Sequence, residues 1–94
     1  MVVGLCVVEL LLPGSRSLKD KRLLIKGIKD RLRARFNLSL AEVDFQNLWQ
    51  RAKIGMVSIA SSKDVLHTTI NKAIEIIESN TQCEIIDCHV EYLI

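Results

Sequence analysis

The chain contains few of the residues that cross-link a fold or favour tight turns of the backbone. Its 94 residues include three cysteines, one proline and four glycines. The cysteines, Cys6, Cys83 and Cys88, are odd in number and form no C-x-x-C pair. That pattern argues against a disulfide framework and against a zinc site. We therefore expect free thiols in a reducing compartment.

Aromatic residues and long apolar runs are also scarce. Aromatics make up 4% of the chain, whereas hydrophobic residues as a whole make up 49%, so valine, isoleucine and leucine must build the core. No apolar run approaches the roughly eighteen residues of a membrane span. Residues 1–13 resemble a signal sequence, but Glu9 interrupts them and they lack a basic start and a small-residue cleavage site. We expect one cytoplasmic domain over residues 1–94, with no membrane association.

Catalytic signatures are missing as well. The sequence contains no H-E-x-x-H, no Ser-His-Asp pattern, no Gly-rich dinucleotide loop and no Walker A loop. A conceivable metal or general-base site is formed by four residues expected on one face of adjacent strands, although an exposed strand is the simpler interpretation: Glu9, Asp87, His89 and Glu91. His67 has no obvious catalytic partner. We expect a non-enzymatic protein with no catalytic residue, cofactor or metal ligand.

What the chain does have is an uneven distribution of charge. Nine lysines and arginines fall between residues 13 and 36 with only two acids, so this segment carries a formal +7. The rest of the chain carries −5, and the two parts combine to the modest net charge of +2. A basic segment on an acidic body predicts an anionic partner, and nucleic acid is the first candidate.

Hydrophobic periodicity predicts six elements in the order βαββαβ. Strands are expected at residues 2–12, 38–45, about 52–60 and 83–93. Helices are expected at residues 17–36, with Ser17 as N-cap, and from Ser61 or Ser62 to about Ser79. The predicted fold is an α+β, ferredoxin-like sandwich. In it, a four-stranded antiparallel sheet of order 4-1-3-2 has both helices on one face.

The other face of this sheet is then open. Alternation places Glu9 there on the first strand and five further polar residues on the later strands, namely Glu42, Asp44, Asp87, His89 and Glu91. The expected face has an apolar centre and an acidic rim. With Trp49 of the strand connector docking on another subunit, it predicts a homo-oligomer, most simply a dimer. The predicted interface residues are Val3, Leu5, Val7, Leu11 and Trp49.

The first helix carries a stripe of cations beside its apolar seam. At 100° per residue, five side chains fall within an arc of about 80°, and they span about 21 Å along the axis. They are Lys19, Arg22, Lys26, Lys29 and Arg33. No acid within the stripe relieves their repulsion, and a helix N-terminus disfavours cations. Anion binding would explain the arrangement, although a merely solvated face is the alternative.

The start of this helix predicts a sharper site. Free backbone N–H groups at a helix N-terminus attract anions. A phosphate there would be held by Arg16, Lys19, Lys21 and Arg22. We therefore expect an RNA or ribosomal partner that is bound by charge and shape, because the middle strands lack the aromatic run on which RNA-recognition domains stack bases. The alternative is an oligomeric interaction protein that binds no nucleic acid.

Three stretches resemble one known family. PGSRSLKDKR at residues 13–22, RFNLSLAEV at residues 35–43 and LWQRA at residues 48–52 are similar to the YlxP-like family, a bacterial family of unknown function. The resemblance covers nearly the whole chain. It implies a ferredoxin-like fold and a small cytoplasmic protein, often encoded near translation-initiation and ribosome-maturation genes, with no established catalytic residues. Family members often have a polar residue where this chain has Val7 or Leu11, so the open face here should be more apolar.

Overall fold

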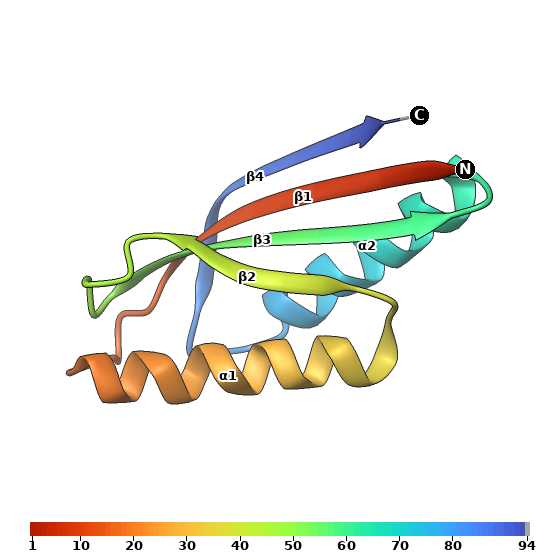
Figure 1. Ribbon diagram of the computed structural model, residues 1–94. Coiled ribbons are helices and arrows are strands. Elements are labelled where there is room, and N and C mark those ends of the chain that lie inside the picture. Colours follow the sequence, from red (N-terminus) through yellow and green to blue (C-terminus); the bar gives the residue numbers. More distant parts are fainter. Residues whose placement is uncertain (94) are drawn as a thin grey trace.

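The computed structural model describes residues 1–93 and contains six regular elements (Figure 1). Their order along the chain matches the predicted βαββαβ. The strands are β1 (Val2–Leu11), β2 (Ser39–Asp44), β3 (Arg51–Ala60) and β4 (Glu84–Leu93). The helices are α1 (Leu18–Arg35) and α2 (Lys63–Glu78).

The four strands form one antiparallel sheet in the order β2-β3-β1-β4. Read from the opposite edge, this is the order 4-1-3-2. Both helices lie on the same side of the sheet, as Figure 1 shows. The α+β class with a four-stranded antiparallel sheet is confirmed, and the arrangement is compatible with a ferredoxin-like sandwich.

The core lies between the sheet and the two helices. On β1 every second side chain faces the helices, and Cys6, Val8 and Leu10 are fully buried. The packing of α2 on β1 is close at Gly4, because a Cβ atom there would lie 2.8 Å from Ile70 Cδ1 and would force that side chain to shift. The helices contribute apolar residues at helical spacing: Ile25, Ile28 and Leu32 on α1, and Leu66, Ile70, Ala73 and Ile77 on α2.

The opposite face of β1 is open, as predicted. Its half-buried residues are Val3, Leu5, Val7, Glu9 and Leu11. The exposed residues of β4 lie on the same face, because Glu91, His89 and Asp87 pair with Leu5, Val7 and Glu9. The predicted orientation of β1 and of these three polar residues is therefore confirmed.

The prediction for β2 was wrong at one residue. Leu38 and Leu40 are buried toward the helices, and Glu42, two residues further on, faces the same side. A register shift between Glu42 and Asp44 then turns Asp44 to the open face, where it pairs with Lys53. Both leucines belong to the core between the sheet and the helices, so Glu42, two residues beyond Leu40, faces the helices as well.

The three cysteines are free thiols in this structure. Cys6 and Cys83 are buried, whereas Cys88 is exposed on β4. Burial raises the pKa of the Cys6 thiol to about 12, and the adjacent Cys88 thiol adds to this shift. Across residues 1–93, neither helix is both long enough and apolar enough to cross a bilayer.

Candidate nucleic-acid interface

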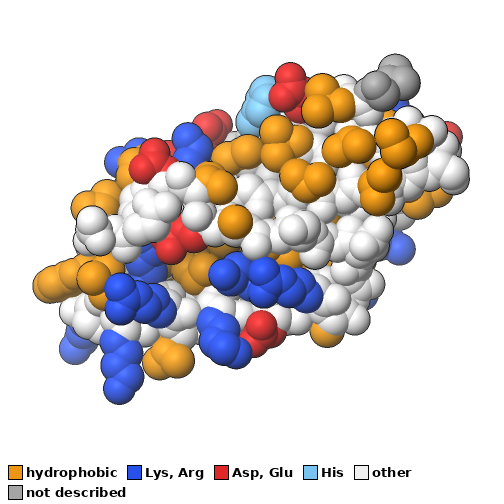
Figure 2. Space-filling view, in the orientation of Figure 1, with side chains coloured by type: hydrophobic (Ala, Val, Ile, Leu, Met, Phe, Trp, Pro, Cys, Tyr) orange, Lys and Arg blue, Asp and Glu red, His pale blue; other side chains and the backbone are white. Residues whose placement is uncertain are grey.

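The predicted cations of α1 lie together on one surface. Ile25, Ile28 and Leu32 face the core, so the side of the helix beside them projects outward next to strand β2. Lysine and arginine side chains gather there, along α1 and below β2, in Figure 2. We call the following five residues the basic stripe; Lys29 is half-buried and the other four are exposed: Lys19, Arg22, Lys26, Lys29 and Arg33.

Two members of the basic stripe already have protein partners. The Arg33 guanidinium donates a hydrogen bond of 3.1 Å to the carbonyl oxygen of Leu40, which places this end of the stripe against β2. Lys26 forms an exposed ion pair of 2.6 Å with Asp30. The expectation that no acid relieves the stripe was therefore wrong, because Asp30 lies one turn beyond Lys26. The hydrogen bond from the Lys26 ammonium, together with nearby cations, lowers the pKa of the Asp30 carboxyl group.

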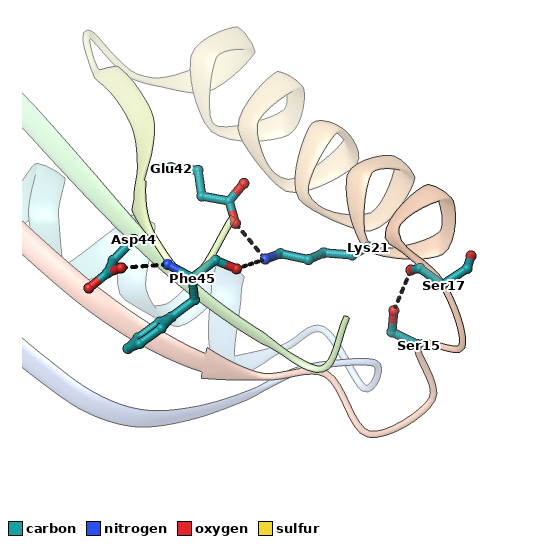
Figure 3. Close-up of polar contacts among 6 residues, drawn as sticks. All are labelled: Ser15, Ser17, Lys21, Glu42, Asp44 and Phe45. Atoms are coloured by element: carbon teal, nitrogen blue, oxygen red, sulfur yellow. Dashed lines mark hydrogen bonds and ion pairs between the residues drawn. The ribbon is translucent and has the colours of Figure 1, made fainter. Parts of the chain in front are cut away.

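Lys21 was wrongly predicted to bind phosphate. Its side chain is 1% exposed and lies beneath β2 (Figure 3). Its ammonium is 2.7 Å from Glu42 Oε2 and donates to the carbonyl oxygen of Phe45. The spacing contained the signal for this placement, because Lys21 precedes Ile25 by four residues and Ile28 by seven. It therefore lies on the core-facing side of α1, with Ile25 and Ile28, rather than in the basic stripe.

The first turn of α1 is also less open to an anion than predicted. Ser17 Oγ accepts a hydrogen bond of 3.0 Å from the Asp20 backbone N–H, and the Asp20 carboxylate accepts one of 3.0 Å from the Arg16 backbone N–H. Ser15 Oγ donates to the Ser17 carbonyl oxygen (Figure 3). The chain's own carboxylate thus lies where the phosphate was expected. Arg16, Lys19 and Arg22 remain exposed around it.

The connector between β2 and β3, residues 45–50, begins with a strained residue. Phe45 has φ 62°, a left-handed conformation that side chains other than glycine seldom adopt. Lys21 binds its carbonyl oxygen, and its N–H donates a 2.7 Å hydrogen bond to Asp44 Oδ1 (Figure 3). The Arg51 guanidinium lies 4.4 Å from the centre of the Phe45 ring. The buried Lys21 side chain, which pairs with Glu42 and donates to Phe45, therefore stabilises the conformation of the connector where it begins.

The other end of the connector is tied to the turn before α1. The side-chain amide of Gln50 donates to the carbonyl oxygens of Pro13 and Ser15, at 3.3 and 3.1 Å. The Leu12 N–H donates to the Gln50 carbonyl oxygen at 2.9 Å. The backbone at Gln50, which follows Trp49 directly, therefore lies beside the turn that leads into α1. The Trp49 side chain is 53% exposed.

The predicted oligomer-interface residues extend along the whole length of β1 and beyond it to the connector. On β1, Leu11 pairs with Arg51 at the Trp49 end of β3, whereas Val3 pairs with Ile59. Eight residues of strand, about 26 Å, separate Arg51 from Ile59. Trp49 thus lies at the opposite end of the sheet from Val3.

Each histidine has its own polar neighbours. His67 shares hydrogen bonds with Tyr92 and Asn71, and His89 is 4.0 Å from Glu91. No three His, Cys, Asp or Glu side chains of the described residues are grouped for a metal ion. A hollow of about 710 Å³ between α1 and the α2–β4 connector is lined by neither histidine, whereas a hollow of about 400 Å³ on the open face of the sheet is lined by His89.

Comparison with known proteins identifies the family of this chain and a solved structure with the same fold. Residues 3–90 match the family described as "Protein of unknown function (DUF503)". The chain is 29% identical over 83 residues to "Uncharacterized protein YlxP" of Bacillus subtilis (strain 168), covering 88% of this chain and 90% of that protein. A solved structure, "De novo designed protein Foldit4", has the same overall fold, with a TM-score of 0.56, 11% identity and coverage of 100% and 98% of the two chains. The chain therefore belongs to the DUF503 family of proteins of unknown function.

Proposed function

We propose that this protein binds the phosphate backbone of RNA, free or within a ribosomal particle, through the basic stripe of α1. The observation that carries the proposal is the grouping of five cations on one face. Lys26 pairs with Asp30 and Arg33 donates to the Leu40 carbonyl oxygen, whereas the Lys19 and Arg22 side chains are exposed. The stripe spans about 21 Å, enough to follow several phosphates of one strand. We propose a cytoplasmic, non-catalytic role.

Helix stability alone does not favour this placement of charge. Lys19 and Arg22 lie in or near the first turn of α1, where the helix dipole disfavours cations by roughly 0.3–1 kcal/mol each. Like charges at three- and four-residue spacing add a smaller repulsion. A bound polyanion would reverse the sign of both effects. The central strands β1 and β3 carry no aromatic residue, so base recognition on the sheet is not part of the proposal.

A salt series tests the proposal directly. We expect affinity for single-stranded RNA to fall with salt with a logarithmic slope near −3, because each contacted phosphate contributes about −0.7. Replacing exposed Arg22 by glutamine should flatten the slope by about 0.7. Filter binding measures this, with Lys72→Gln on α2 as a control of equal charge. Absence of binding at low salt, or equal slopes for wild type and Arg22→Gln, would refute the proposal.

A second candidate function is self-association through the open face of the sheet. Three apolar side chains there are unusually exposed: Val57 at 41%, Ile59 at 49% and Leu93 at 53%. They adjoin Leu5 and Val3 across the β1 pairings, and hydrophobic side chains gather over this end of the sheet in Figure 2. A second copy placed face to face would cover them.

Replacing Ile59 by lysine tests self-association. The charge would lie within the apolar face, beside Val3, so we expect a dimeric wild type to become monomeric. Light scattering and sedimentation measure the change. Val65→Lys is a matched control, because Val65 is 53% exposed but lies on α2. A wild type that stays monomeric when concentrated would exclude this second function.

A further inference from the structure

We propose that Trp49 stacks on an unpaired base, so that the site formed by α1 and the β2–β3 connector prefers single-stranded RNA to duplex. This inference rests on the proposed function, because the basic stripe must first bring an RNA strand to the surface. It assigns Trp49 to nucleic-acid binding rather than to an oligomer interface.

The position of Trp49 relative to the cations is the first support. Gln50, its neighbour, donates hydrogen bonds to Pro13 and Ser15, the residues that lead into α1. Exposed Arg16 follows Ser15 directly, and Lys19 and Arg22 begin the basic stripe. At the left end of Figure 2, where α1 begins in Figure 1, hydrophobic side chains project beside lysine and arginine side chains. A strand whose phosphates follow α1 would carry its bases past the connector.

The composition of the connector is the second support. Residues 45–50 contain no acid, although acids outnumber bases in the chain outside residues 13–36. Exposed Gln46 and Asn47 precede Trp49 and offer amide groups to base edges. Asp20, the acid of the adjoining turn, already accepts from the Arg16 backbone N–H. The connector therefore places amide groups and no acid next to Trp49 in the chain, and acids there would repel a nucleic-acid strand.

The rigid attachment of the connector is the third support. Trp49 is 53% exposed, which leaves its ring accessible to a ligand. The connector that carries it is nevertheless fixed at both ends, by the Lys21 contact to Phe45 and by the Gln50 amide. A platform held in place before binding loses little conformational entropy when a base stacks on it.

Tryptophan fluorescence tests the inference, because Trp49 is the only tryptophan in the chain. A short oligoadenylate should quench the emission of Trp49 on binding, and an RNA duplex of equal length should quench it less. Trp49→Ala should weaken oligoadenylate binding by about 5- to 100-fold and leave duplex binding nearly unchanged. Trp49→Phe, which keeps an aromatic face, should retain most of the affinity. Circular dichroism checks that each variant is folded.

The outcomes separate this inference from the proposed function. Salt-dependent RNA binding that Arg22→Gln weakens, with no quenching and no effect of Trp49→Ala, would overturn the stacking inference alone. A Trp49→Ala variant that changes self-association but not RNA affinity would do the same and assign the ring to a protein contact. Failure of both oligoadenylate and duplex to bind at low salt would overturn both.

Discussion

Replacing Lys21 by methionine is expected to lower the free energy of unfolding by about 2–4 kcal/mol. The substitution keeps the apolar stem of the side chain but leaves the Glu42 carboxylate without its partner at 2.7 Å. It also removes the donor to the carbonyl oxygen of Phe45, a residue held at φ 62°. The Glu42 side chain is 21% exposed, so water offsets part of the loss. Urea denaturation measures the change.

A double variant separates the lost pair from general damage to the core. Lys21→Met combined with Glu42→Leu removes both charges, and we expect most of the lost stability to return, because two apolar side chains can replace a buried pair at little cost. Lys26→Met is the matched surface control: its pair with Asp30 is exposed, and its loss should cost about 0.5 kcal/mol or less. A Lys21→Met protein as stable as the wild type would show that the pair contributes nothing.

Reversing two charges at the start of the basic stripe is expected to separate RNA affinity from stability. In the double variant Lys19→Glu and Arg22→Glu, two phosphate contacts become repulsions, and affinity for RNA at moderate salt should fall on the order of 100-fold or more. Stability should stay equal or rise by about 0.5 kcal/mol, because acids are favoured near a helix N-terminus. Filter binding and urea denaturation together measure the two effects.

The matched control for this variant is Lys63→Glu with Lys72→Glu on α2. It changes the net charge by the same amount on the other helix, so it should alter RNA affinity only a few-fold. Equal losses in the two double variants would show that only the overall charge matters. Such a result would contradict a site on α1.

Local patterns in the sequence were sufficient for the elements and for much of their orientation. Alternation along β1 correctly indicated that Val3, Leu5 and Val7 face away from the helices. Ser17 was correctly identified as the N-cap of α1. The spacing of the basic stripe was likewise sufficient to place its cations on one side of α1. These features depend on periods of two and 3.6 residues and on contacts within a turn, which neighbouring residues specify by themselves.

The errors concern contacts between distant segments. Lys21 lies within the apolar seam of α1, yet its charge led to its assignment to the phosphate site. Its burial depends on Glu42 and on Phe45, 24 residues away, and no local pattern identifies such a partner. The orientation of Glu42 followed from the burial of Leu40 and from a register shift that alternation does not reveal.

The sequence by itself thus determined the order of elements, the open face of β1 and the basic stripe of α1. Only the tertiary structure decided which cations remain free and where Trp49 lies. The reason is that helical periodicity gives the direction in which a side chain leaves the helix axis, but not which other segment packs against that side chain. Docking of α1 under β2 buried Lys21 and left Arg22 exposed. The hydrogen bonds of Gln50 brought the connector, and with it Trp49, to the start of that helix.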